Sequence, residues 1–332
     1  MHDYSKTEPQ KFSSEEIRER ISRWLEPEKV PRKLNIITDT FDFYRIDYDD
    51  VVILGDKPYL IRNNEREGRF GIDDQQKYWV KRARDLSDGS VKIIKFVFYE
   101  RFEANVGGIV FDCYRSPKKE ARILDLTRDH PRFMHGFPVS DTAKNIIRVL
   151  DFITGKTLAD SVLTLGKDHE DYFHNHLPYV LDEFIELTKA IRFLHEHGEK
   201  HGDIRRDHII KDKETGTARW IDFDFNYLHK ENMFGYDLFG LGNILVYLVA
   251  RGDVTVQNLR QQLSPVVARL TADDMNIIFN NRIVNLQKVY PYVPEALNLI
   301  LLHFSVGANI YYDNTDQLLH DLWEARGNLG QA

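Results

Sequence analysis

Residues 201–225 read HGDIRRDHIIKDKETGTARWIDFDF and carry two aspartates, Asp203 and Asp222, at the two ends of a predicted β-hairpin. Two short runs rich in β-branched and aromatic residues flank a turn at residues 213–216. Such a hairpin holds both carboxylates on one rigid edge. One carboxylate could then orient a hydroxyl or accept its proton, while the other holds a divalent metal on phosphate oxygens. Aspartates at strand ends are also common turn formers, so the flanking sequence must decide between the two interpretations.

The composition is that of an ordinary globular protein. Of its residues, 42% are hydrophobic and 29% are charged. Its length of 332 residues is enough for two domains or for one two-lobed domain. A net charge of −7 argues against nucleic acid or anionic lipid as a general partner. The single cysteine, Cys113, excludes an internal disulfide, and its aromatic neighbours favour a packed thiol. With no apolar signal core and no run long enough to span a bilayer, we expect a cytoplasmic protein.

Strand patterns dominate the chain from about residue 34 to residue 111. Lys95 lies among apolar residues in the last predicted strand, and Glu120 lies in the first turns of a helix predicted over residues 117–126. Before residue 34, a Ser/Glu capping box predicts a docking helix over residues 14–25. The predicted strands cover residues 51–54, 59–62, 78–86 and 91–98.

The second half of the chain is predicted to be helical. A glycine turn at residues 154–156 ends the β-rich part, and the composition changes there. The strongest amphipathic pattern covers residues 181–197, and residues 237–250 are so apolar that their helix must be buried on every side. We therefore expect an N-terminal extension over residues 1–33, a β-rich lobe over residues 34–150 and a helical lobe over residues 151–332.

The order of these features resembles the protein-kinase-like superfamily over about residues 70–325. Lys95 is similar to the strand lysine that contacts nucleotide phosphates, and Glu120 to its partner on the following helix. The sequence LDFI resembles the hinge that follows the gatekeeper, so the resemblance implies nucleotide contacts at Asp151 and Ile153. It also implies an α+β, two-lobed protein-kinase-like fold with a β-rich N-lobe and a helical C-lobe.

The two aspartates of the hairpin match the same family. The triplet HGD, which ends at Asp203, resembles the catalytic loop, and Arg205 stands where that loop carries a basic residue. The triplet DFD, which begins at Asp222, resembles the metal-binding DFG motif. The apolar helix from residue 237 resembles the helix that braces the catalytic loop. Because these motifs occur together and in order, they are far more specific than any one of them alone.

The resemblance implies phosphoryl transfer, in which the protein mainly positions groups and stabilises charge. Asp222 would hold Mg²⁺ on the phosphates of ATP, with Mn²⁺ as a further candidate ion. Lys95, aimed by Glu120, would neutralise phosphate charge. Asp203 would orient the acceptor hydroxyl, and Arg205 would stabilise charge on the transferred group. The implied partners are a nucleotide and a protein or small molecule that carries the hydroxyl.

Several residues depart from the family pattern. His208 occupies the place of an asparagine that binds a second metal, although Mg²⁺ prefers oxygen ligands. Asp224 replaces the glycine of DFG, and it is either an additional candidate metal ligand or a turn residue. The expected phosphate-cradling loop, residues 71–77, has one glycine and two aspartates, which weakens the expectation of nucleotide binding. Residues 223–236 contain no serine or threonine, so phosphorylation of a loop threonine is excluded and a constitutively arranged site is expected.

Three functions remain open. The leading prediction is an atypical, compact Ser/Thr protein kinase, RIO-like or bacterial in type, that recognises its acceptor by a folded surface. HGD also occurs in aminoglycoside- and choline-type phosphotransferases, which favours a small-molecule kinase as an alternative. His208 and the glycine-poor loop favour a pseudokinase that only binds or scaffolds. The retained motif residues argue against that last function: Lys95, Glu120, Asp203 and Asp222.

Overall fold

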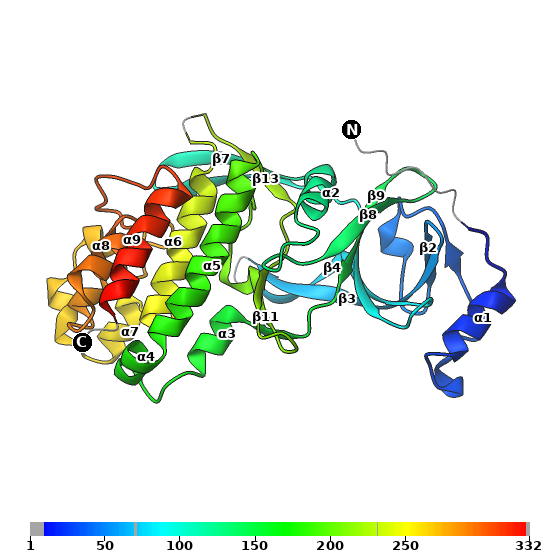
Figure 1. Ribbon diagram of the computed structural model, residues 1–332, viewed down its shortest axis with the longest axis horizontal. Coiled ribbons are helices and arrows are strands. Elements are labelled where there is room, and N and C mark those ends of the chain that lie inside the picture. Colours follow the sequence, from blue (N-terminus) through cyan, green and yellow to red (C-terminus); the bar gives the residue numbers. More distant parts are fainter. Residues whose placement is uncertain (1–9, 70–71, 231, 330–332) are drawn as a thin grey trace. The chain divides into compact units, whose positions relative to one another are not determined.

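A computed structural model describes residues 10–69, 72–230 and 232–329 (Figure 1). Its contacts divide the chain into two compact units, and each is described by itself. Unit 1 comprises Met1–Tyr99, Ser116–His130 and Met134–Ile153, and unit 2 comprises Glu100–Arg115, Pro131–Phe133 and Thr154–Ala332. The domain boundaries predicted from the sequence, at residues 33 and 150, stay a prediction. None of the helices in the described parts of the chain is long and apolar enough to cross a membrane.

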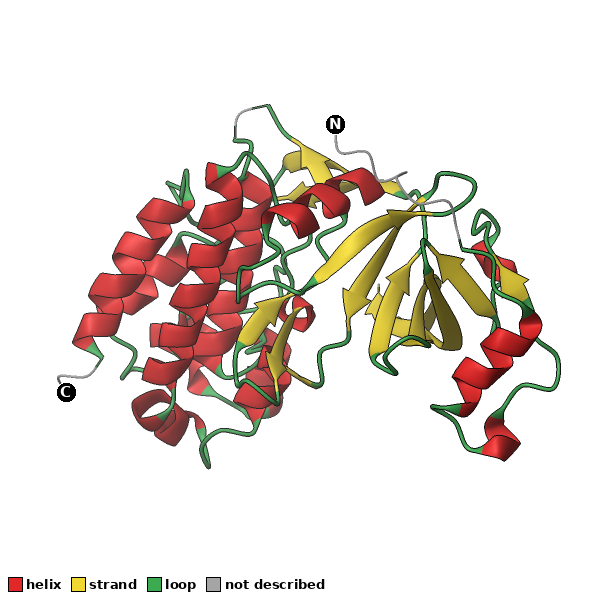
Figure 2. Ribbon diagram, turned by 45° about the vertical axis from the view of Figure 1, so that its right-hand side comes forward, coloured by secondary structure: helices red, strands yellow, loops and turns green. Residues whose placement is uncertain are grey.

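Unit 1 is built on a curled seven-stranded sheet in the order β1-β2-β3-β4-β5-β9-β8 (Figure 2). One core cluster of this unit includes Tyr59, Phe96 and Ile147, all fully buried. The strands are β1 (Ile36–Ile37), β2 (Val51–Leu54), β3 (Lys57–Arg69), β4 (Ile72–Asp85), β5 (Val91–Lys95), β8 (Gly136–Ser140) and β9 (Ile146–Asp151).

Helix α1 (Ser14–Ser22) begins at the predicted capping box, in which the Ser13 hydroxyl and the Glu16 carboxylate each accept the other residue's backbone N–H. The helix ends at Ser22, three residues earlier than predicted. Ile17 and Ile21, one turn apart on the same face, are fully buried in a cluster with strands β2 and β3. The predicted docking helix is therefore part of the core of unit 1.

Three strands of this sheet differ from their predicted bounds. Strand β3, predicted over residues 59–62, extends over Lys57–Arg69. Strand β4 begins at Ile72, so the described part of the expected phosphate-cradling loop is strand, paired with β3 at Glu65↔Lys77. Gly71, the glycine of that loop, lies outside the described residues. Strand β5 ends at Lys95 because its pairing with β9 ends there, at Lys95↔Arg148. Lys95 is thus the last residue of its strand.

Unit 2 is mainly helical, which confirms the predicted α+β class and its helical C-terminal part. Helix α5 begins one turn before the predicted start, with Pro178 in its first turn, where the missing N–H costs no hydrogen bond. Helices α5, α6 and α9 lie side by side (Figure 1). The helices are α3 (Leu158–Leu163), α4 (His169–Asn175), α5 (Leu177–Glu196), α6 (Gly235–Ala250), α7 (Val256–Gln261), α8 (Glu295–Leu302) and α9 (Thr315–Asn328).

The hairpin predicted between the two aspartates is confirmed. Its strands β11 (Ile209–Asp212) and β12 (Ala218–Trp220) pair in register Ile210↔Arg219, and β10 (Gly155–Thr157) adds a third strand. Trp220 is fully buried, and its indole N–H donates a 3.0 Å hydrogen bond to the carbonyl oxygen of Leu187 on α5. The longest helix of the described chain therefore fixes the hairpin that carries the candidate residues.

A second hairpin was not predicted. Strands β6 (Arg101–Val106) and β7 (Ile109–Arg115) meet at Gly107 and Gly108, whose φ values of 58° and 89° require glycine. Strand β7 also pairs with β13 (Phe225–Leu228), in register Phe225↔Arg115. Cys113 lies in β7, where burial raises the pKa of its thiol to about 12, as expected of a packed thiol. This hairpin belongs to unit 2 although it lies between Lys95 and Glu120 in sequence.

Candidate active site

The backbone of the HGD triplet is held by Asp237 of helix α6. The fully buried Asp237 carboxylate accepts the amides of His201 and Gly202, both at 2.8 Å, and the Nε2–H of His195 at 3.0 Å. Burial by itself would raise the pKa of Asp237, but these partners outweigh it and lower the pKa, so the carboxylate is charged at neutral pH. Gly202 has φ 83°, a conformation that excludes most other residues. The predicted bracing of the loop by a buried helix is thus present in unit 2.

The same loop approaches helix α6 closely at Gly240. A Cβ atom at this position would lie 2.7 Å from the Cβ of Ile204 and 2.9 Å from the Ile204 carbonyl oxygen. We expect Gly240→Ala to lower the free energy of unfolding by about 1–3 kcal/mol, because the loop must move away from the helix. Urea denaturation measures this change.

Gly235→Ala, on the same helix, is the matched control. The atoms nearest to its added Cβ belong to Asn232, at an ordinary contact distance of 3.5 Å or more. This variant should be neutral or stabilising, by up to about 1 kcal/mol, because alanine restricts the unfolded chain. Equal unfolding free energies for both variants would show that the close approach at Gly240 does not matter.

Asp203, His208 and Asp222 lie together in unit 2. The Nδ1–H of His208 donates a 2.8 Å hydrogen bond to the backbone carbonyl of Asp203. His208 Nδ1 is also 3.6 Å from Asp203 Oδ2, and His208 Nε2 is 3.7 Å from Asp222 Oδ2. The His208 side chain is 4% exposed and the two aspartate side chains are 14% exposed. The structure therefore brings three predicted site residues together around one imidazole.

The backbone of Asp222 has φ 62°, in the left-handed region. Asparagine and aspartate tolerate this region better than other residues with a Cβ, although the conformation still costs free energy. Strained residues of this kind are concentrated at functional sites, where the surrounding structure holds them. The conformation sets the direction in which the Asp222 carboxylate leaves the chain towards His208.

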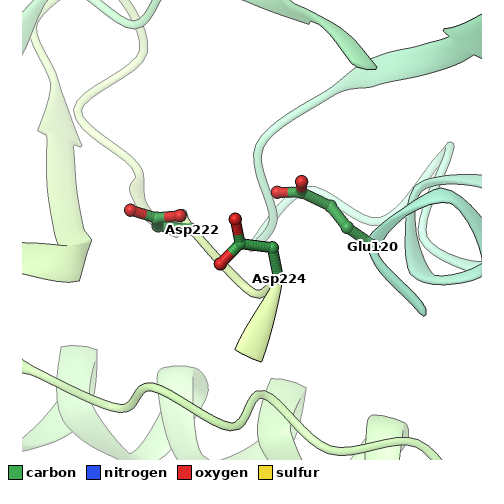
Figure 3. Close-up of side chains that lie close together, drawn as sticks. All are labelled: Glu120, Asp222 and Asp224. Atoms are coloured by element: carbon green, nitrogen blue, oxygen red, sulfur yellow. The ribbon is translucent and has the colours of Figure 1, made fainter. Parts of the chain in front are cut away.

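Asp224 lies two residues further along the segment that leads into β13, as Figure 3 shows. Its carboxylate is fully buried and accepts two hydrogen bonds from Nη1 of Arg115, at 2.7 and 2.6 Å. Burial would lower the pKa of Arg115, but the charges of Asp224 and Asp222 outweigh burial and raise it. Asp224 as a metal ligand stays a prediction, and in the structure its two oxygens are bound to Arg115.

Arg205, the predicted charge-stabilising residue, forms a two-bond fork with Asp207. Arg205 Nε donates to Asp207 Oδ1 at 3.0 Å, and Nη2 donates to Oδ2 at 2.6 Å. Burial would raise the pKa of Asp207, but His208 and Arg205 outweigh it and lower the pKa. The fork orients the Arg205 guanidinium, whose role towards a phosphate stays a prediction.

In unit 1, the predicted ion pair between Lys95 and Glu120 is present. Lys95 Nζ lies 2.8 Å from Glu120 Oε1, and Arg148 Nε, on strand β9, donates to Glu120 Oε2 at 2.9 Å. All three side chains are buried. Glu120 projects from helix α2 (Pro117–Leu126), as Figure 3 shows. Arg148 was missed from the sequence, where the one signal is an arginine within an apolar strand, a pattern that does not show whether the side chain faces the core or the solvent.

The predicted hinge follows directly from strand β9. The backbone N–H of Asp151 donates to the carbonyl oxygen of His135 at 2.9 Å, and its carboxylate pairs with Lys92 Nζ at 2.6 Å. Ile153 is half-buried and is the last residue of unit 1. The nucleotide contacts expected at Asp151 and Ile153 stay predictions.

Several known proteins that resemble the chain are kinases, although no protein-family model matches it. CBL-interacting protein kinase 33 of Oryza sativa is 25% identical over 152 residues, 46% of this chain and 30% of the relative. Putative ribosomal protein S6 kinase alpha-2 of Caenorhabditis elegans is 23% identical over 195 residues, 58% of this chain and 20% of the relative. The chain therefore spans less than half the length of these relatives.

Among solved structures, the PknI kinase domain of Mycobacterium tuberculosis is 12% identical, with a TM-score of 0.45. The match covers 80% of this chain and 95% of that domain. The similarity to kinases rests on the sequence relatives and on motifs that occur in the predicted order. In these respects the chain resembles the protein-kinase-like superfamily.

Proposed function

We propose that the protein is an atypical Ser/Thr-type protein kinase, which transfers the γ-phosphate of ATP to a hydroxyl acceptor with the help of a divalent metal. The observation that carries this proposal is the group formed by Asp203, His208 and Asp222, together with the hydrogen bonds by which Asp237 fixes the HGD loop. Two carboxylates that differ in their surroundings can divide the work between proton transfer and metal binding.

Each residue has a separate task in this proposal. Asp203 orients the acceptor hydroxyl and takes its proton, while Asp222 holds the metal. Lys95, aimed by Glu120, neutralises charge on the nucleotide phosphates, and Arg205 stabilises the transferred group. The hinge residues Asp151 and Ile153 contact the nucleotide base.

The donor atoms of Asp222 and His208 fit a divalent ion. Because a carbonyl oxygen only accepts, His208 must carry a proton on Nδ1, which leaves Nε2 to act as a ligand. Two atoms bound to one ion at about 2.1 Å each are at most about 4.2 Å apart, and the 3.7 Å between Nε2 and Asp222 Oδ2 satisfies this limit. The ion, when bound, would offset negative charge on the phosphates. An imidazole ligand suits Mn²⁺ better than Mg²⁺.

We expect His208 to determine the preferred metal. The natural protein should bind Mn²⁺ with a non-hydrolysable ATP analogue more tightly than Mg²⁺ with the same analogue. His208→Asn replaces the nitrogen ligand with an amide oxygen and should shift the ratio of the two affinities towards Mg²⁺ on the order of tenfold. Calorimetric titration measures both affinities. His176→Asn, a histidine on a different part of unit 2, is the control, and an unchanged ratio in His208→Asn would contradict the assignment.

The acceptor of this proposed kinase is a protein with a folded recognition surface. Residues 223–236 are short and contain no serine or threonine. Strand β13 within this segment is already paired with β7, so little free chain remains to hold an extended peptide. The small-molecule kinase stays as an alternative, since HGD is compatible with it.

A pseudokinase is the second candidate, and one observation favours it. The imidazole of His208 lies between both carboxylates, where a bound cation would otherwise offset their charge. A radiolabelled ATP transfer assay with Mn²⁺ or Mg²⁺ decides among the three functions, using whole-lysate proteins, aminoglycosides and choline as acceptors. Transfer to protein that Asp222→Asn abolishes supports the proposal. Nucleotide binding by calorimetry with no transfer to any acceptor would favour the pseudokinase.

A further inference from the structure

The residue that replaces the glycine of the DFG motif is an aspartate with no exposure to solvent. A buried carboxylate is costly unless it is paired and hydrogen-bonded. Asp224 meets this requirement through Arg115, whose side chain is 1% exposed and whose Nη1 lies 2.7 and 2.6 Å from the two carboxylate oxygens. A pair this buried, between residues distant in sequence, holds two segments of unit 2 together.

Arg115 is itself fixed on its remaining sides. Its Nη2 and Nε lie 3.0 and 3.3 Å from one oxygen of Glu100, and its guanidinium lies 4.0 Å from the ring centroid of Phe225. The planar guanidinium thus uses different nitrogens for two carboxylates and its face for an aromatic ring. Lysine offers neither the fork nor the flat face, so it could not replace Arg115 in this arrangement.

The backbone reinforces the pair. Arg115 and Phe225 are register partners at the start of the β7–β13 ladder, and Phe102 of β6 contacts the Phe225 ring edge-to-face with centroids 5.5 Å apart. Asp224 directly precedes this ladder. Its position is therefore fixed both by its own side chain, through Arg115, and by the pairing of the next residue, Phe225. Asp222, with its left-handed backbone, lies two residues upstream.

We propose that Arg115 and Asp224 form a built-in clamp that keeps Asp222 in the conformation from which its carboxylate reaches His208. Arg115 is then a positioning residue for the metal ligand, and Asp224 serves the clamp in place of the ligand role expected from the sequence. Residues 223–236 contain no serine or threonine, so phosphorylation of such a residue cannot order this segment. In this proposal the clamp orders it instead. The assignment of Asp222 as metal ligand rests on the proposed function.

The test uses a double variant of the full chain, Arg115→Met/Asp224→Gly. Removing Arg115 alone would leave a buried charge and could prevent folding, whereas removing both charges is often tolerated. The control is Arg101→Met, which breaks an exposed ion pair with Asp112 on the same hairpin. Two measurements are made: Mn²⁺ affinity by calorimetry with an ATP analogue, and hydrogen exchange of the amides of residues 222–228.

We expect the double variant to fold, to bind Mn²⁺ at least tenfold more weakly than the natural protein, and to exchange these amides faster. The control should match the natural protein in both measurements. A folded double variant with unchanged Mn²⁺ affinity would overturn the proposal, since a merely structural pair would give that result. If the natural protein binds no Mn²⁺, the proposed function fails. Hydrogen exchange alone then decides whether the clamp exists, and unchanged exchange in a folded double variant would overturn the clamp. A double variant that does not fold also overturns it, because the pair would then be required for the fold as a whole.

Discussion

Asp203→Asn is expected to reduce phosphate transfer by roughly 10²-fold or more and to leave nucleotide affinity nearly unchanged. The amide has almost the same shape as the carboxylate, so the loop geometry set by Asp237 should persist. It cannot accept a proton, however, and the acceptor hydroxyl loses its general base. Steady-state kinetics measure turnover, and calorimetry with an ATP analogue measures affinity.

Asp212→Asn is the matched control for this prediction. Asp212 lies in the same hairpin and accepts the amide of Glu214 at 2.9 Å, which an asparagine side-chain oxygen can also do. Its turnover should equal that of the natural protein. If a pure preparation of Asp203→Asn transfers phosphate at the natural rate, Asp203 is not the base.

The second large effect is expected at Glu120, measured as stability. Glu120→Gln removes the negative charge shared by two buried cations, Lys95 and Arg148, whose side chains are 4% and 0% exposed. For Arg148, Glu120 supplies the compensating charge. Leaving a buried cation without its compensating charge typically costs about 3–5 kcal/mol. Urea denaturation should therefore show a large loss in the free energy of unfolding.

Lys95→Met provides the contrasting variant. It leaves Glu120 paired with Arg148 at 2.9 Å, so the loss of stability should be clearly smaller. Nucleotide affinity should nevertheless fall, because the phosphates lose a positive charge. Equal losses of stability in the two variants would show that Arg148 does not compensate Glu120.

The sequence allowed site residues to be predicted where they belong to short motifs that occur in a fixed order. Lys95 and Glu120 could be matched as a pair because each lies in a recognisable local pattern, and their ion pair is present. Arg148 could not be assigned in the same way. An arginine in a strand usually faces solvent, and only the tertiary structure shows that this one is buried against Glu120.

The hairpin of β6 and β7 was missed for a different reason. The adjacent glycines 107 and 108 signal a turn, but no local pattern reveals that β7 pairs with β13. Arg115 and Asp224 are 109 residues apart in sequence, so their contact is a property of the folded chain alone. The assignment of Asp224 as a candidate ligand or turn residue could not include this partner.

The pairing of β7 with β13 also bears on how the protein is made. During synthesis, β7 leaves the ribosome long before Phe225–Leu228 exist, and about 109 residues at 5–20 residues per second correspond to a delay of roughly 5–20 s. In that interval β6 and β7 form an isolated two-stranded hairpin, which is only marginally stable in water. Its open edge is a template for pairing with other chains. Nascent chains that stall before residue 225 should therefore be the most prone to aggregate and the most dependent on chaperones.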